Sequence, residues 1–346
     1  MTTRLYRAGS VVVALAAGAA GALLASLVGL PAPALVGSTL AVLFASIAGA
    51  RPDVPNALRD PAFAVIGMTL GAGVTPTILD DIARWPLSLA GMVLTLLAAT
   101  ALAAFALART GANRATALLA TSPGALSYAL ALAVEHSSDG KGGGVDLRLV
   151  TVLQSIRLVA ITVLVPPLVA GLDGGGTHGS AETASTIAES VAMLAIASLG
   201  GIALVRARVP AAWLIAGLLV SAIAHAAGWV EGRPAPSLLA TGFVVAGAVI
   251  GSRFAAVTGA ELRRMAGLGA ALATLAMAVS AAGSAVAAHW LALPFGQVWV
   301  AYAPGGVEGM AAIALALGYD PVFVATHHIA RLAVLMLVLP WMVRGP

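Results

Sequence analysis

The residues best able to do chemistry in this sequence lie at two proline-glycine motifs within long apolar segments. The first motif is Pro123-Gly124 and the second is Pro304-Gly305-Gly306. Proline removes a backbone donor and glycine permits unusual dihedrals, so each motif predicts a helix break. A helix that begins just after a break presents free N–H groups and a positive dipole end to an anion or carboxylate. Both breaks, with Ser127 after the first, are therefore candidate ligand sites; a kink without a ligand is the alternative.

Two arginines, one after each motif, lie at equivalent positions in later apolar segments. Arg157 and Arg331 stay charged, so each needs an acid, carbonyl oxygens or an anionic ligand. Each follows an aspartate, Asp146 or Asp320, by 11 residues, which is about 16 Å along a helix. That depth makes snorkelling to the membrane surface difficult. We consider a substrate or coupling role for the arginines; the alternative is a structural ion pair, for example of Arg331 with Glu308.

Glu308 follows the second break by two residues. An acid inside a membrane is costly and therefore indicates a function, here carrying a proton or coordinating a cation. A local cap on the N–H groups of the new helix is the alternative.

His328 and Gln154 precede the two arginines by three residues, so they share a helical face with them. Histidine titrates near neutral pH, which makes His328 a candidate proton relay; a satisfied interior histidine is the alternative. His327 and His328 diverge by about 100 degrees on a helix, which disfavours a metal pair. We expect no metal, no cofactor and no enzymatic activity.

The elements that must position these residues are apolar segments. Of 346 residues, 60% are hydrophobic and 9% are charged, whereas an ordinary soluble domain carries about 25% charged residues. The sequence predicts an all-α integral membrane protein, and without cysteine it has no thiol chemistry. Twelve segments are predicted, at residues 9–29, 31–50, 61–78, 86–108, 115–134, 147–171, 185–205, 211–230, 236–254, 265–289, 296–317 and 321–343.

Six of these segments repeat as the following six. The run at 67–71 matches 247–251 at an offset of 180, and the motif at 122–126 matches 303–307 at 181. Arg157 matches Arg331 at 174. Three motifs in one order predict an internal duplication, with a first membrane repeat at 9–171 and a second at 185–343.

The basic residues indicate how the repeats are oriented. Suppose that segments 115–134 and 296–317, which carry the breaks, dip into the membrane and return. Then 14 of the 18 Lys and Arg lie inside, Arg84 and Arg233 lie outside, and two lie within segments. The prediction is about ten crossings plus two re-entrant or broken segments, cytoplasmic termini and inverted halves, as in secondary transporters. In the alternative, the broken segments cross and another segment fails to span.

Three runs carry a resemblance to a known family: 122–127, 303–310 and 320–332. With them the sequence resembles the AbrB-type duplicated membrane protein family of bacteria over roughly residues 10–343, not the small soluble DNA-binding regulators of that name. The resemblance implies labels such as regulator of gene expression or ammonia monooxygenase, and a duplication similar to cation-antiporter and bile-acid-type transporter folds. The family pattern reads Pro-Gly-Gly-x-x-Glu-Met; here Tyr128 and Gly309 stand where its acids would fall.

We expect a secondary transporter or permease of a small solute, with an anionic solute favoured, in the bacterial cytoplasmic (inner) membrane. The expected partners are the lipid bilayer, the solute and a proton or cation as candidate coupling ion, with a homo-oligomer as a further expectation. Direct binding of nucleic acid is not expected. One alternative is a membrane regulator of gene expression that acts through a partner. Another is an oxygenase-associated membrane subunit, although the sequence offers no convincing cluster of metal ligands.

Overall fold

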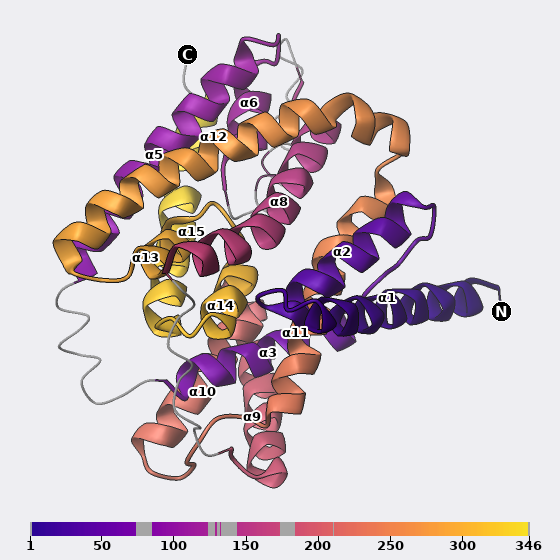
Figure 1. The fold of residues 1–346 in the computed structure, drawn as a ribbon, viewed down its shortest axis with the longest axis vertical. Coiled ribbons are helices and arrows are strands. Elements are labelled where there is room, and N and C mark those ends of the chain that lie inside the picture. Colours follow the sequence, from indigo (N-terminus) through magenta and orange to yellow (C-terminus); the bar gives the residue numbers. More distant parts are fainter. Residues whose placement is uncertain are drawn as a thin grey trace. The chain divides into compact units, whose positions relative to one another are not determined.

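The structure, a computed structural model, describes residues 2–73, 85–123, 129, 132, 144–173, 184–209 and 211–344 (Figure 1). Gly124 and Ser127 lie outside the described residues, as does most of segment 115–134 beyond Pro123. Within the described ranges the regular secondary structure is helical, apart from one isolated β-bridge between Ala184 and Arg233. The all-α expectation is confirmed for this part of the chain. The helices are α1 (Thr2–Leu27), α2 (Pro33–Ile47), α3 (Asn56–Gly71), α5 (Trp85–Ala108), α6 (Arg114–Thr121), α8 (Leu147–Asp173), α9 (Ile187–Arg206), α10 (Ala212–Ala226), α11 (Pro236–Ser252), the 3₁₀ turn η1 (Arg253–Ala256), α12 (Gly259–Leu291), α13 (Phe295–Tyr302), α14 (Val307–Ala316) and α15 (Pro321–Arg344).

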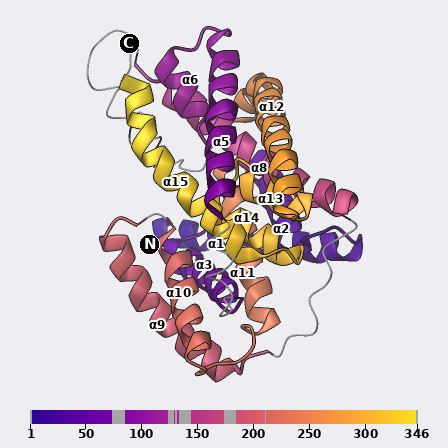
Figure 2. The ribbon, with the colours of Figure 1, turned by 90° about the vertical axis from the view of Figure 1, so that its left-hand side faces the viewer.

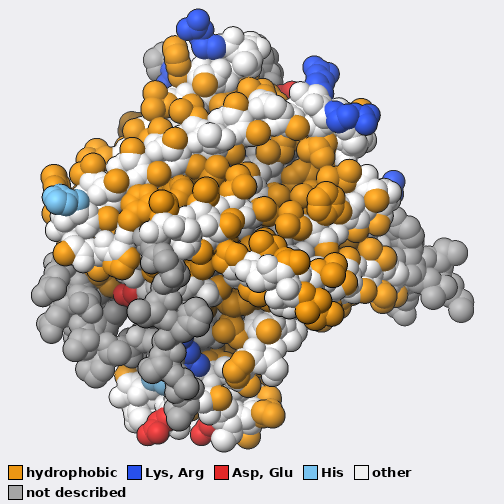
Figure 3. All heavy atoms as spheres, in the orientation of Figure 1, with side chains coloured by type: hydrophobic (Ala, Val, Ile, Leu, Met, Phe, Trp, Pro, Cys, Tyr) orange, Lys and Arg blue, Asp and Glu red, His pale blue; other side chains and the backbone are white. Residues whose placement is uncertain are grey.

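Seven helices in the described ranges are long and apolar enough to cross a membrane: α1, α5, α8, α9, α11 with η1, α12 and α15. Their outward faces carry large apolar side chains, such as Leu27 (73% exposed), Leu199 (70%) and Leu337 (73%). Hydrophobic side chains are spread over the face shown in Figure 3. The exposed Trp290 and Trp341 lie near the ends of α12 and α15. Water disfavours such a surface, whereas lipid matches it.

The chain divides into two compact units. Unit 1 takes its described residues from 1–83, 162–256 and 308–325, and unit 2 takes them from 84–161, 257–307 and 326–346. Each unit draws segments from both predicted repeats, 9–171 and 185–343. The units and the repeats are therefore different divisions of the chain, and the repeat boundaries stay a prediction.

In unit 1, α3 packs tightly against α10 through two glycines. A Cβ built on Gly67 would lie 2.0 Å from the Leu214 oxygen, and one on Gly71 would lie 2.3 Å from the Leu218 oxygen. Only glycine allows backbones to approach this closely. The contact moves four residues along α3 and four along α10, so the two helices run in the same direction.

The helices α11 and α2 form an equivalent pair in unit 1. A Cβ on Gly247 would lie 2.5 Å from the Leu35 oxygen, and one on Gly251 would lie 2.7 Å from the Thr39 oxygen. This pair also runs in parallel. The two glycines of α11 match those of α3 at the offset of 180, and Leu35 and Thr39 match Leu214 and Leu218 at an offset of 179. The two contacts are thus reciprocal between the halves of the chain.

Local backbone geometry recurs between the same two helices. Helices α2 and α10 are both 15 residues long. Each begins after an alanine in the left-handed region, Ala32 or Ala211, with φ of 52° in both. Each is followed by a glycine of positive φ, Gly49 (95°) or Gly228 (68°). Non-glycine residues seldom adopt positive φ, so a matched pair of such alanines is a specific structural similarity.

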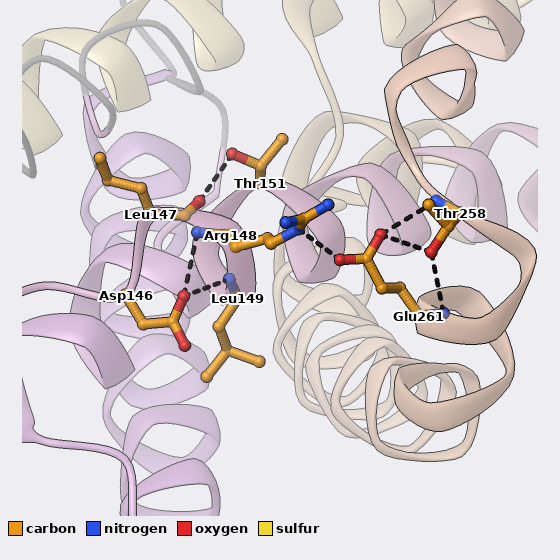
Figure 4. Close-up of polar contacts among 7 residues, drawn as sticks. All are labelled: Asp146, Leu147, Arg148, Leu149, Thr151, Thr258 and Glu261. Atoms are coloured by element: carbon orange, nitrogen blue, oxygen red, sulfur yellow. Dashed lines mark hydrogen bonds and ion pairs between the residues drawn. The ribbon is translucent and has the colours of Figure 1, made fainter.

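Unit 2 is built around the packing of α5 on α12, which lie side by side in Figures 1 and 2. A Cβ on Gly283 of α12 would lie 2.2 Å from the Thr95 hydroxyl oxygen of α5. At one end of the unit, Arg148 in the first turn of α8 forms an ion pair with Glu261 in the first turn of α12 (Figure 4). Glu261 also completes a capping box with Thr258. The starts of α8 and α12 are thereby joined.

Candidate functional site

The first break follows α6. This helix ends at Thr121, and Ser122 is its extended C-cap (φ −63°, ψ 125°). Pro123 has no N–H, so the Leu119 carbonyl four residues earlier loses its usual helical partner. The Gln154 side chain replaces that partner, because its Nε2 donates to the Leu119 oxygen at 2.6 Å.

At the second break, the helix that precedes the proline ends in a similar way. Helix α13 ends at Tyr302, α14 begins at Val307, and the residues between them are not α-helical. Pro304 leaves the Val300 carbonyl without its helical donor. His328 Nε2 lies 2.9 Å from the Val300 oxygen. A carbonyl only accepts hydrogen bonds, so the His328 proton lies on Nε2.

Each arginine binds the carbonyl oxygens at the end of its broken helix. Arg157 donates to the oxygens of Thr121 (2.8 Å) and Ser122 (3.1 Å). Arg331 donates to the Ala303 oxygen at 2.5 Å and to the Gly305 oxygen. Free carbonyls at a helix C-terminus carry partial negative charge, which favours a cation there.

These contacts define two clamps. The first clamp is Gln154 with Arg157 on α8, and the second clamp is His328 with Arg331 on α15. The donors and the arginines both recur at an offset of 174, and the accepting carbonyls of Leu119 and Val300 recur at 181. The two residues of each clamp lie three positions apart on one helix, as predicted. In the structure they contact the carbonyl end of the helix that precedes the proline. Sequence patterns identified the donors but not their acceptors.

Neither arginine is neutralised by an acid in the described residues. The ion pairs there are Arg59 with Asp60 and Arg148 with Glu261. Arg157 is 7% exposed and Arg331 is 1% exposed. The Nε atom of each has no hydrogen-bond partner in the structure, and the two guanidinium groups repel each other electrostatically. Unit 2 therefore contains two buried positive charges held by neutral carbonyls.

A polar network that the sequence did not point to lies beside the second clamp. The Tyr302 hydroxyl donates to the Ser88 carbonyl at 2.6 Å, and His327 Nε2 lies 2.8 Å from the Ser88 hydroxyl. The Tyr302 and His327 rings are stacked with centroids 6.0 Å apart. His327 is fully buried. Ser88 lies in α5 and reaches Tyr302 and His327 only because distant parts of the chain pack together. No local sequence pattern predicts this contact.

The acids have separate positions. Glu308 lies in the first turn of α14, in unit 1, where it is half-buried and interacts electrostatically with Arg253. Asp146 and Asp320 are helix N-caps, and each accepts two backbone N–H groups, from residues 148 and 149 or 322 and 323. Among the described residues, no group of three or more His, Cys, Asp or Glu is arranged to hold a metal ion.

The described residues define a class: a helical protein with apolar outer faces, two short helices that end ahead of Pro123 and Pro304, and two buried cationic clamps. The chain belongs to the AbrB family, since the family described as "Transition state regulatory protein AbrB" matches residues 34–345. The expected family is thereby confirmed. A curated relative, "Putative regulator AbrB" of Escherichia coli (strain K12), is 23% identical over 322 residues, which cover 91% of this chain and 90% of the relative. No solved structure matches the chain.

Proposed function

We propose that this protein is a secondary transporter of a small anionic solute, and not an enzyme. The observation that carries the proposal is the pair of buried guanidinium groups, Arg157 and Arg331, which no acid in the described residues neutralises. Buried charge is costly unless it is paired. An anion that enters unit 2 supplies the missing partner, and a small solute is the natural one for a membrane protein with broken helices.

Helix directions support inverted repeats. Consecutive crossings alternate in direction, so two parallel helices are separated by an odd number of crossings. Between α3 and α10, which run in parallel, lie α5, α8 and α9, each long enough to cross. Three is an odd number, as parallel helices require. If all twelve predicted segments crossed, four crossings would separate α3 from α10 and the two helices would be antiparallel. The helix α2 and its counterpart α10 then point in opposite directions, which is what inversion requires.

The proposal therefore keeps ten crossings: α1, α2, α3, α5, α8, α9, α10, α11, α12 and α15. The two segments that carry the breaks are re-entrant. The bacterial cytoplasmic membrane, with both termini on the cytoplasmic side, is the location that fits the distribution of Lys and Arg. Glu308, the acid of the second break, is the candidate carrier of a coupling proton or cation, and a homo-oligomer is compatible with the exposed apolar faces.

A flux assay in proteoliposomes tests the proposal. The purified protein is reconstituted, and uptake of a panel of radiolabelled carboxylates and inorganic anions is measured for the wild type, Arg157→Gln and Arg331→Gln. We expect saturable uptake that both substitutions reduce at least about tenfold, the loss of one charge-assisted contact. Arg264→Gln, an exposed residue of α12, is the matched control. Uptake unchanged in both buried variants would contradict the proposal.

A second candidate function is a membrane regulator of gene expression that acts through a partner. The description of the family and the printed name of the E. coli relative favour it. It predicts a co-purifying transcription factor and expression changes on deletion of the gene, without solute flux in vesicles. Flux by the purified protein alone separates the two functions.

A further inference from the structure

A small cavity lies beside the first clamp, inside unit 2. Its volume is about 10 Å³, which is room for one water-sized particle. Helices α5, α6, α8 and α12 all contribute to the wall, which includes Ala120, Thr121, Leu153, Arg157, Leu272 and Ala276.

The wall combines one cationic group with an apolar surround. Arg157 is 7% exposed, and its Nε has no hydrogen-bond partner in the structure. Thr121 has already used its hydroxyl proton, which it donates to the Ala117 oxygen at 2.8 Å. The other named residues of the wall are apolar. Such a site favours a single acceptor that carries negative charge and loses little on leaving water.

The equivalent position in the second repeat is occupied by protein. Thr121 corresponds to Tyr302 at an offset of 181, and Leu153 corresponds to His327 at 174. The Tyr302 ring stacks on His327, and its hydroxyl oxygen would lie 3.0 Å from a Cβ built on Gly91. The two clamps therefore have different surroundings: the first borders a cavity, and the second borders a packed aromatic group.

We propose that the cavity binds one small monovalent anion of halide size, held by the Arg157 guanidinium, and that the second clamp has no such site. The proposal deepens the proposed function, on which it rests for the anionic class of the solute. Size selects a single-atom anion or one oxygen of a carboxylate, and charge selects an anion over water. Two sources share this chemistry, a free halide and the charged end of the transported solute.

Halide binding is measured by thermal unfolding of the purified protein in detergent. Sodium chloride or sodium bromide is titrated at constant ionic strength against sodium gluconate, whose anion is far larger than the cavity. We expect the wild type to gain stability along a saturable curve, as a ligand of the folded state does. Arg157→Gln raises the apparent Kd by about tenfold or more. Arg331→Gln raises the apparent Kd far less than Arg157→Gln does, because Arg331 acts on the cavity only through its long-range charge.

Variants that change cavity shape exclude a general effect of charge. Thr121→Tyr places in the first repeat the residue that the second repeat carries, and it abolishes the halide response. Ala276→Leu fills the cavity from α12 with the same result, in case Thr121→Tyr does not fold. Tyr302→Phe keeps the response. Equal halide curves for the wild type and Arg157→Gln, or equal losses in Arg157→Gln and Arg331→Gln, overturn the proposal.

Flux and binding separate this inference from the proposed function. If halide binding is lost in Arg157→Gln and no solute is transported, the halide site is supported and the proposed transport function is contradicted. If transport requires both arginines and halide does not stabilise the protein, the halide site is contradicted and the proposed transport function is supported. If bromide competes with the transported solute, the charged end of the solute also occupies the cavity. If the two do not compete, the cavity binds the free halide alone.

Discussion

At the scale of residues, the N–H that each proline lacks explains the Gln154 contact of the first clamp and the His328 contact of the second. Pro123 and Pro304 each leave a carbonyl without a helical donor, and a side chain three residues before a buried arginine supplies the replacement. Gln154 supplies it in one repeat and His328 in the other. Gln and His share the property of an N–H donor at the end of a side chain of similar reach. Proton transfer is not needed to explain why His328 is there.

The first prediction follows from this equivalence. His328→Gln keeps a donor to the Val300 oxygen, so we expect an unfolding midpoint and a flux close to wild type. His328→Leu leaves a buried carbonyl without a partner and costs about 1–2 kcal/mol. Thermal unfolding in detergent and the flux assay measure both. If His328 instead relays a proton, His328→Gln folds normally but loses pH-driven flux.

The second prediction concerns the geometry of the arginine. Arg331 spans two carbonyls, of Ala303 and Gly305, and lysine offers a point charge that cannot span both in the same way. We expect Arg331→Lys to destabilise the protein by about 1–2 kcal/mol. Arg264→Lys, on the exposed face of α12, serves as the control and stays within about 0.5 kcal/mol. Equal stability of both variants would mean that charge alone holds the break.

At the scale of elements, paired glycines bring helices into backbone contact. Gly67 and Gly71 join α3 to α10, and Gly247 and Gly251 join α11 to α2. Association of helices in lipid depends on such close packing, because the surrounding lipid is as apolar as the side chains. The sequence analysis found these four residues as a repeated motif. It could not say which helix each one faces, because that depends on contacts with distant parts of the chain.

The third prediction uses one substitution at two kinds of site. In Gly71→Ala the new Cβ would lie 2.3 Å from the Leu218 oxygen, so α3 and α10 must separate, which costs about 1–3 kcal/mol. Gly267→Ala in α12 meets nothing within 4 Å, and we expect no loss because alanine favours helix more than glycine does. Thermal unfolding in detergent gives the midpoints of the two variants, and we expect a lower midpoint for Gly71→Ala than for Gly267→Ala. A Gly267→Ala protein as unstable as Gly71→Ala would rule out close packing as the cause.

Helix ends show where sequence reasoning succeeds and where it does not. The segment predicted at 31–50 contains α2 (Pro33–Ile47), and hydrophobic runs were sufficient to find it. Helix α12 begins at Gly259, before the predicted start at 265, because Thr258 and Glu261 form a capping box in a polar stretch. Hydropathy does not detect a helix start in a polar stretch, although the spacing of Thr258 and Glu261 predicts it. The carbonyl partners of the clamps are beyond any such signal, since they depend on the path of the broken backbone.

At the scale of the whole molecule, the directions of the packed helices support the proposed topology. Parallel packing of α3 on α10 and of α11 on α2 requires an odd number of crossings between the partners of each pair. The distribution of Lys and Arg, which does not depend on these glycine contacts, favours the same arrangement.

The fourth prediction tests that topology directly. The chain has no cysteine, so Arg51→Cys, Arg233→Cys and Arg263→Cys each introduce one unique label. Impermeant maleimide applied to inside-out vesicles should label positions 51 and 263, and maleimide applied to intact cells should label position 233. The reason is that Arg51 precedes α3 and Arg263 begins α12, with an even number of crossings between them. Labelling of positions 51 and 263 from opposite sides would require an odd number of crossings between them, and the inverted arrangement would then be wrong even though the two clamps remained.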